Sequence, residues 1–351
     1  MRKVFLSLSL MAYVALNAAS PYLSKVYDFM PAPGQFVNEL PEYDDGDDLN
    51  DIISKVEEQI CGDKMPGMVT LGAWGGYVVF GFDHPVVNIK GDYDFKIYGN
   101  AFAATGSTTG GSCEPGIVMV SYDDNGNGIP DDKWYELAGS EYGKSTTIQQ
   151  YRLTYYRTPS THVPNPDNDY KYITDRTYIR WTDNCGGEGY VMKNSFHNQD
   201  YWPMWIDADT LIFEGARLPD NGVDRSSNGT NYVLSFFDYG YVDNRPNNED
   251  RGFNIDWAVD EHGEAVHLPA IHFIKVYNAI NQYCGWLGET STEIQGGEDL
   301  HPDAEVSGID IINVNALQEV EYFNLQGVKV ENPQQGMFLM RKGHHISKVM
   351  L

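Results

Sequence analysis

Cysteine, basic side chains and long apolar runs are all scarce in this chain of 351 residues. No C-x-x-C pair occurs among its four cysteines, which excludes the zinc sites built on that spacing. Lys and Arg together number 24 against 50 Asp and Glu. So negative a surface repels the phosphates of nucleic acids, and we expect no nucleic-acid partner.

Sequence signatures of catalysis are also missing. The chain contains no G-x-S-x-G, H-E-x-x-H or P-loop motif, and no G-x-G-x-x-G that opens a helix. Carboxylates are so frequent that a glycosidase pair cannot be identified from spacing. We therefore predict no catalytic residues, and a carbohydrate-active hydrolase remains an alternative.

The N-terminus has the pattern of an export signal over residues 1–20. Arg2 and Lys3 precede an apolar run, Val4–Leu16, that is too short to span a bilayer comfortably. Small residues for cleavage follow, namely Ala18, Ala19 and Ser20. In an exported protein, an even number of cysteines permits disulfides, and free buried thiols are the alternative for Cys61, Cys113, Cys185 and Cys284.

The stretch Asp123–Asp132, D-D-N-G-N-G-I-P-D-D, has the spacing of a calcium loop. Oxygen-bearing side chains at every second position can converge on one hard cation, and Gly128 permits the sharp turn. We predict a structural Ca²⁺ held by Asp123, Asn125, Asn127, Ile129, Asp131 and Asp132.

The same composition also suits an ordinary turn, because Asx side chains hydrogen-bond their own backbone. The twelfth loop position, where a bidentate Glu is usual, is Trp134. Asp132 or Glu136 would have to supply the missing carboxylate. A regulatory EF-hand is therefore not expected.

Hydrophobic periodicity predicts an all-β protein. One amphipathic helix is expected over Leu49–Ile60, capped by Asp47 or Asp48. Strand periods recur between turn residues, in Met68–Leu71, Tyr77–Phe80, Phe95–Tyr98, Ile117–Val120, Trp134–Leu137, Tyr151–Tyr155, Tyr178–Trp181, Thr210–Phe213, Tyr232–Phe237 and His272–Tyr277. Many short strands favour a β-sandwich, of the jelly-roll type, over residues 21–288.

The C-terminal part divides into two pieces. Residues 289–308 are rich in Thr, Ser and Gly and have no period, which predicts a linker. Short strand patterns return over residues 309–351, where we expect a small separate β module.

Two loops are candidates for binding. The first mixes amide, acidic and aromatic side chains of the kind that contact polar planar ligands: Asn184, Glu188, Tyr190, His197, Tyr201, Trp202 and Trp205. The alternative for the two tryptophans is that they pack at the end of the sandwich. The second, Asp243–Arg251, could hold a second calcium or be a solvated acidic turn. The turn is favoured because Arg245 and Arg251 can pair with its acids.

The tail pattern resembles a known module. Val320–Val330 includes Tyr322-Phe323-Asn324-Leu325-Gln326-Gly327, and is followed by Pro333, Gly336-Met337-Phe338 and Lys342-Gly343. This resembles the C-terminal sorting domains of Bacteroidota surface proteins. The resemblance implies export by a type IX-like route or display on the outer membrane, with the sorting machinery as a partner.

The body resembles a group of Bacteroidota cell-surface proteins, some labelled PKD-like. The resemblance rests on Met30–Phe36, Gly81–His84, Asp94–Phe102, Glu114–Gly116, Asp123–Asp132, Arg180–Asn184, Asn254–Asp260 and Phe273–Tyr277. Some such proteins are found beside outer-membrane corrinoid uptake components, which would then be partners. The resemblance implies nutrient capture.

From these observations we expect a secreted or surface-displayed, calcium-stabilised β-sandwich that binds a small molecule, a corrinoid or a glycan. The alternatives are the hydrolase named above and a structural or adhesive surface protein. The adhesive alternative predicts no concave pocket.

Overall fold

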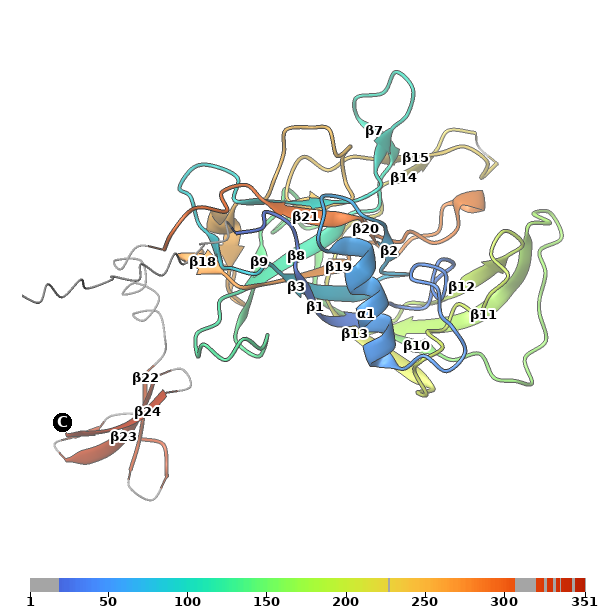
Figure 1. The fold of residues 1–351 in the computed structure, drawn as a ribbon. Coiled ribbons are helices and arrows are strands. Elements are labelled where there is room, and N and C mark those ends of the chain that lie inside the picture. Colours follow the sequence, from blue (N-terminus) through green and yellow to red (C-terminus); the bar gives the residue numbers. More distant parts are fainter. Residues whose placement is uncertain are drawn as a thin grey trace, which may run out of the picture.

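The computed structural model describes residues 19–306 except 227, and residues 320–350 except 325–326, 331–332, 335 and 343–344. Within these residues the protein is almost entirely β, with antiparallel sheets and a single α-helix (Figure 1). The predicted fold class is confirmed. Most of the predicted export signal, residues 1–18, lies outside the described residues.

The largest sheet has seven antiparallel strands and forms the centre of the body (Figure 1). Its order is β1 (Lys25–Met30), β3 (Tyr77–Gly81), β19 (Phe273–Asn278), β8 (Gly116–Ser121), β9 (Trp134–Leu137) and β17 (Ala258–Val259), and β16 (Tyr241–Val242) also pairs with β8. Val78, Val118 and Val276 are fully buried, in strands that are apolar on most positions. The sheet builds the first core cluster, which includes Phe29, Phe80, Val118 and Ile274.

A four-stranded sheet stands beside it, in the order β12 (Glu188–Asn194), β11 (Ile173–Asp183), β10 (Ile148–Tyr156) and β13 (Thr210–Arg217). Tyr151, Leu153 and Tyr155 of β10 are fully buried, while Arg152 between them is exposed. This is the period of two expected for a strand with one face against a core. The buried faces form the second core cluster with Trp74, Tyr201 and Trp202.

Shorter elements complete the body. One sheet contains β14 (Gly222–Asp224), β15 (Tyr232–Ser235), β7 (Gly110–Ser112) and β6 (Phe102–Ala103). Three two-stranded sheets pair β18 (Ala270–Ile271) with β4 (Val86–Val87), β2 (Val69–Thr70) with β20 (Glu293–Ile294), and β21 (Gly296–Asp299) with β5 (Phe95–Tyr98). Two 3₁₀ turns are η1 (Ile255–Trp257) and η2 (Gly285–Leu287). In the tail, β22 (Val320–Phe323), β23 (Met337–Lys342) and β24 (His345–Met350) form a sheet of their own (Figure 1).

The predicted helix is confirmed as α1 (Leu49–Ile60). Asp48 accepts hydrogen bonds from the N–H groups of Asn50 and Asp51 and closes a capping box. Ile52, Val56 and Ile60 are fully buried against the first core cluster. In the described part of the chain, no helix has both the length and the apolar character needed to cross a membrane.

The first half of the expected linker, residues 289–299, is instead an interior segment. It contains β20 and β21, and the run from Glu289 to Glu293 is at most 5 % exposed at every residue. The polar composition is typical of a solvent-exposed linker, but these buried residues form hydrogen bonds with distant segments inside the protein. Thr70, for example, hydrogen-bonds Ser291 at 3.2 Å.

The cysteines form no disulfide: Cys61, Cys113, Cys185 and Cys284 are all free thiols. Cys113 and Cys284 are buried in one small core cluster, where they act as apolar residues. The fold is therefore held by packing and hydrogen bonding without covalent bridges.

The central sheet should be the part most sensitive to cavity formation. Ile274→Ala removes a side chain that is 1 % exposed and should lower the free energy of unfolding by about 2–5 kcal/mol in urea titrations. Ile212→Ala, at a 50 % exposed position of β13, is the matched control and should change it by less than about 0.5 kcal/mol. Equal effects of the two substitutions would contradict this location of the core.

Candidate functional site

The Asp123–Asp132 loop joins β8 to β9, and its polar side chains form hydrogen bonds with other groups of the loop. Asp123 accepts hydrogen bonds from the N–H groups of Gly126, Asn127 and Gly128 at 2.7, 3.1 and 2.9 Å. Gly128 has a φ of 71°, in the left-handed region that glycine adopts without strain. The predicted sharp turn is present, and the protein's own groups shape it.

The other expected calcium ligands also lie within contact of one another. The amides of Asn125 and Asn127 donate to Asp131 at 3.3 and 3.2 Å, and Asn125 also donates to Asp132 at 3.3 Å. The Ile129 carbonyl accepts the N–H of Asp131 at 2.8 Å. A half-turn of each amide would present its oxygen in place of its nitrogen, and the set would then be an oxygen cage of the type Ca²⁺ prefers.

Three of the predicted ligand-binding residues are packed into the protein. Tyr201 and Trp202 are 0 and 1 % exposed in the second core cluster. Trp205 packs against the first core cluster, with its ring stacked 6.2 Å from that of Phe29. Their aromatic surface is used in packing, as large aromatic side chains usually are.

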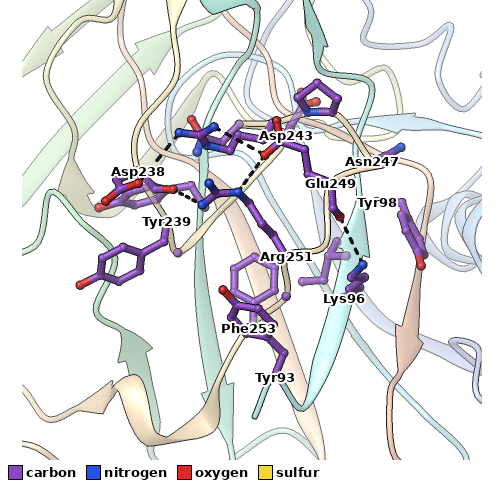
Figure 2. Close-up of a pocket in the computed structure, with 17 residues that line it drawn as sticks. Tyr93, Lys96, Tyr98, Asp238, Tyr239, Asp243, Asn247, Glu249, Arg251 and Phe253 are labelled. Carbon is purple, nitrogen blue, oxygen red and sulfur yellow. Dashed lines mark hydrogen bonds and ion pairs between the residues drawn. The ribbon is translucent and has the colours of Figure 1, made fainter. Parts of the chain in front are cut away.

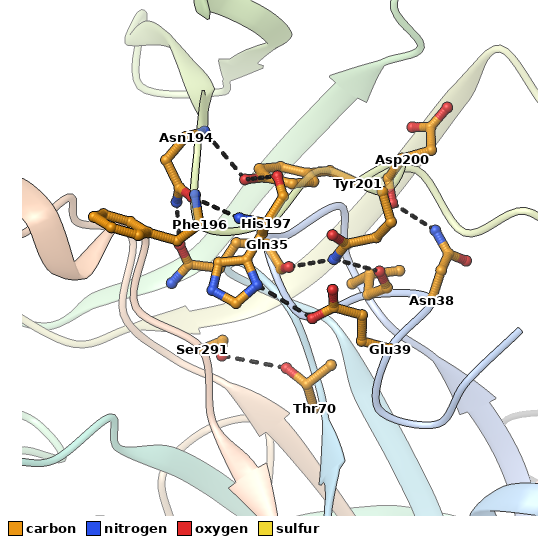
Figure 3. Close-up of polar contacts among 12 residues, drawn as sticks. Gln35, Asn38, Glu39, Thr70, Asn194, Phe196, His197, Asp200, Tyr201 and Ser291 are labelled. Atoms are coloured by element: carbon orange, nitrogen blue, oxygen red, sulfur yellow. Dashed lines mark hydrogen bonds and ion pairs between the residues drawn. The ribbon is translucent and has the colours of Figure 1, made fainter. Parts of the chain in front are cut away.

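His197 belongs to a polar network that ties its loop to residues 35–39 (Figure 3). Its Nδ1 lies 3.1 Å from a carboxylate oxygen of Glu39. The Asn194 amide donates to Gln35 at 2.7 Å, and the Asn194 N–H donates to the Tyr201 hydroxyl at 3.2 Å. These contacts fix the course of the loop.

The remaining predicted residues lie at three different places. Asn184 lines a cleft between the two large sheets, whereas Tyr190 lines a separate cavity of about 120 Å³. Glu188 forms a surface ion pair with Arg180 at 2.9 Å. The seven residues therefore do not converge on one site.

The cleft that includes Asn184 has a volume of about 580 Å³. Strands β8, β9 and β19 of the seven-stranded sheet supply one wall, and β10 and β13 supply the other. The aromatic side chains of Trp134, Tyr142 and Tyr277 share it with the amides of Gln150 and Asn184. Apolar surface with a few polar groups is the usual lining of a small-molecule site.

Two backbone features shape the cleft. Gln150 has a φ of 53° where the pairing of β10 with β13 is shifted by a bulge. Bulges redirect neighbouring side chains, and Gln149, Gln150 and Arg152 all line the cleft. At Gly215 an added Cβ would lie 2.9 Å from the ring of Tyr277, so a glycine is required for this close approach.

Glu136 gives the cleft an unusual carboxyl group. Its position in the sequence also suits a ligand of the calcium loop, but Glu136 lines the cleft from β9. Burial alone raises the pKa of Glu136 to about 7, so the group exchanges its proton near neutral pH. Glu214, Asp260 and Glu261 also line the cleft, and Arg152 pairs with Glu214 at 3.4 Å.

The second candidate loop, Asp243–Arg251, borders a pocket of only about 60 Å³ (Figure 2). The arginines pair with its acids as predicted: Arg251 lies 2.8 Å and Arg245 3.5 Å from Glu249. Arg251 also donates to the Asp238 carbonyl at 2.7 Å. These internal pairs leave little space or free charge for a ligand.

The Asp243 carboxylate belongs to a buried cluster of three carboxylates. Carboxylate oxygens of Glu114, Asp243 and Glu293 lie within 4.8 Å of one another. Asp243 and Glu293 are 3 and 2 % exposed, and Glu114 is half-buried. The three residues are distant in sequence: Glu114 precedes β8, Asp243 follows β16 and Glu293 begins β20.

Hydrogen bonds hold each carboxylate in place. The N–H groups of Asn100 and Ala101 both donate to Asp243 at 2.7 Å. The Asn100 amide and the Thr70 hydroxyl donate to Glu293 at 3.1 and 3.2 Å. In the described residues, no Lys, Arg or His forms an ion pair with any of the three acids.

Burial raises the pKa of all three carboxyl groups, and mutual repulsion adds to the shift for Glu114 and Glu293. Burial, followed by the charges of Glu293 and Asp243, raises the pKa of Glu114 well above its ordinary value. Burial raises the pKa of Asp243 to about 7. Burial and the neighbouring Asp243 raise that of Glu293 to about 8. Such a group of acids can hold shared protons or a cation.

Sequence reasoning missed Glu114 and Glu293 as site residues and named Glu136 only as a candidate for the calcium loop. Glu136 sits in a regular strand pattern, and Glu293 in a polar run that resembled a linker. Only Glu114, in Glu114-Pro115-Gly116, was among the residues that carried the family resemblance. Pairing between strands distant in sequence brings Glu114 and Glu293 together, and no local sequence pattern predicts this contact.

The carboxylate cluster should make stability depend on pH. An acid whose pKa is higher in the folded state binds its proton more tightly there, so stability is greatest below the ordinary pKa and is lost as pH rises through the folded value. With a chelator present to remove calcium, the free energy of unfolding should fall by at least about 1.4 kcal/mol between about pH 5 and pH 8.5, because a pKa shift of one unit is worth that much.

Glu293→Gln replaces one of these acids by a neutral group of the same shape and should flatten the fall between these pH values. Glu42→Gln, at an exposed position, should leave it unchanged. Stability that rises over the same range in the native protein would show that the acids are ionised and paired.

Comparison with known proteins identifies no family: no protein-family model matches this chain, and no curated protein is similar to it. Function is therefore inferred from the cleft and the buried carboxylates.

Proposed function

We propose that this chain is a calcium-stabilised binding protein of the cell exterior that takes a polar ligand of the glycan class in the cleft between its two large sheets. The observation that carries this proposal is the cleft itself, with about 580 Å³ of volume and a mixed aromatic and polar lining. That volume lies within the range of small-molecule sites.

The lining suits a sugar. Sugars offer apolar C–H faces to aromatic rings and hydroxyl groups to amides and carboxylates. The cleft provides aromatic side chains in Trp134, Tyr142 and Tyr277, and polar partners in Gln150 and Asn184. Because Trp134, Gln150 and Tyr277 come from strands of two sheets, the site is largely formed before a ligand arrives.

A hydrolase is the second candidate, and Glu136 favours it. A carboxyl group with a pKa of about 7 can donate a proton near neutral pH, as a general acid must. Glu214, Asp260 and Glu261 in the same cleft are candidates for the second carboxylate that glycoside hydrolysis requires. The concave cleft does not favour the purely adhesive alternative.

Location outside the cell rests on the export-signal pattern, the sorting-like tail and the Asx-Gly loop. Calcium is plentiful there, and a loop with the donor set of Asp123–Asp132 would be occupied. Capture of a nutrient, a glycan in preference to a corrinoid, agrees with these features. The surface uptake components named by the resemblance are the proposed partners.

Binding in the cleft should depend on Trp134. A screen of host and dietary glycans and of cobalamin, followed by calorimetry on the full chain, should yield a glycan ligand. Trp134→Ala should weaken it about tenfold or more, because each aromatic contact contributes at least about 1.4 kcal/mol at such a site. Trp286→Ala, at a 50 % exposed position outside the cleft, is the matched control.

Glu136→Gln separates the two candidates. For a binding protein, affinity changes little and no product forms with either protein. For a hydrolase, the native protein releases reducing sugar and the variant does not. Equal glycan affinity in Trp134→Ala and the native protein would refute binding in the cleft.

Calcium should raise the melting temperature relative to chelator, because a cation that binds only the folded state stabilises it by about 2.7 kcal/mol at one hundred times its Kd. Asp132→Asn should abolish this shift, and Asp250→Asn, at a fully exposed position, should preserve it. Loss of the shift in Glu293→Gln but not in Asp132→Asn would place the ion in the buried cluster instead of the loop.

A further inference from the structure

A second cavity, of about 120 Å³, shares no lining residue with the cleft. Trp74, Trp181, Tyr190 and Tyr283 line it, together with the carboxylate of Glu289. Trp74 is fully buried and Glu289 is 5 % exposed, whereas Tyr190 is 41 % exposed and marks the side that faces solvent. The cavity is therefore a small recess with an aromatic lining and an acid at its wall.

The local sequence makes room for this recess. Trp181 of β11 stands opposite Gly189 of β12, and a Cβ at Gly189 would lie 2.5 Å from the Trp181 indole. Trp74 is fixed by an edge-on contact with Tyr151 at 4.7 Å. Both indoles are thus held by the backbone and by packing before any ligand binds.

Unpartnered polar atoms gather around this cavity. Seven buried side-chain nitrogen or oxygen atoms of the described residues lack a hydrogen-bond partner, and three of them belong to residues that line it: Trp74 Nε1, Tyr283 Oη and Glu289 Oε2. Buried polar groups are normally satisfied by protein, water or a ligand. Three lining residues that each carry such an atom point to a polar occupant of the cavity.

Glu289 determines the charge of that occupant. Its other oxygen, Oε1, accepts a hydrogen bond from the Gln35 N–H, which orients the carboxyl group. Within the described residues, no Lys, Arg or His forms an ion pair with it. Burial raises the pKa of Glu289 to about 8, so a cation beside it would restore the charge that burial disfavours.

We propose that this cavity binds a small primary amine that carries a neighbouring oxygen, with Glu289 as its counter-ion. The ammonium group donates to Glu289 Oε2 and to Tyr283 Oη, and the ligand oxygen accepts from Trp74 Nε1–H. The surrounding aromatic side chains stabilise the positive charge by cation–π attraction. This site is independent of the glycan cleft.

Binding releases a proton. Near pH 7 the Glu289 carboxyl is mostly protonated and the amine is an ammonium ion. When the ammonium enters, Glu289 gives its proton to the buffer and the carboxylate–ammonium pair remains. The positive charge that enters with the ammonium ion equals the charge of the proton that leaves, and no further reactant is needed.

Calorimetry of the full chain with ethanolamine hydrochloride tests the proposal. Ethanolamine should bind, and titrations in two buffers of different ionisation enthalpy should show release of about one proton per amine at pH 7. Choline, which has no N–H donor, should bind about tenfold more weakly, and uncharged ethylene glycol should not bind. Trp134→Ala should leave ethanolamine binding intact, which separates this site from the cleft.

Substitutions of the lining residues test which side chains contact the amine. Glu289→Gln should abolish ethanolamine binding and proton release, while Glu188→Gln, an exposed acid on the neighbouring strand, should keep both. Tyr283→Phe preserves the ring and should weaken ethanolamine about threefold or more by removing one acceptor. No ethanolamine binding by the native protein, or equal binding by Glu289→Gln, would overturn the proposal and leave the cavity to water alone.

Discussion

Burial of carboxyl groups without a cationic partner is the constraint on which the proposed sites of this protein depend. Asp243, Glu293 and Glu289 are buried by the fold, and Glu114 and Glu136 are half-buried. An isolated buried charge is so costly that such a group takes up a proton or acquires a positive partner. Each of these acids is therefore a place where the protein can exchange a proton for a cation, or deliver a proton to a ligand.

The fold places these acids by pairing distant segments. The run from Glu289 to Glu293 crosses the interior beside β2 and β19, where it forms hydrogen bonds with Thr70 and Asn278. One end of the run lines the 120 Å³ cavity, and the other reaches the three-carboxylate cluster. The cleft arises in the same way, because β9 and β19 bring Glu136 and Tyr277 to face β10 and β13 of the second sheet. Pairing between strands distant in sequence thus brings together the residues of all three places.

The sequence predicted the elements well and the sites only in part. The helix Leu49–Ile60 and the alternation of Tyr151, Leu153 and Tyr155 follow from local periodicity, which a single chain displays directly. Trp202 was ambiguous because a loop tryptophan can serve either a ligand or the core, and only packing decides. Residues 289–299 resembled a linker because a polar interior strand lacks the apolar period. Glu114 and Glu293 meet only through long-range pairing, for which the sequence has no local signal.

Side-chain carboxyl titration by carbon-13 NMR tests the central claim most directly. In protein free of calcium and amines, resonances assigned by Glu→Gln and Asp→Asn substitution should show Asp243 titrating near pH 7 and Glu289 and Glu293 near pH 8. If all three carboxyl groups titrate below about pH 5, near the ordinary values for Asp and Glu, these acids are solvated or paired and the account is wrong.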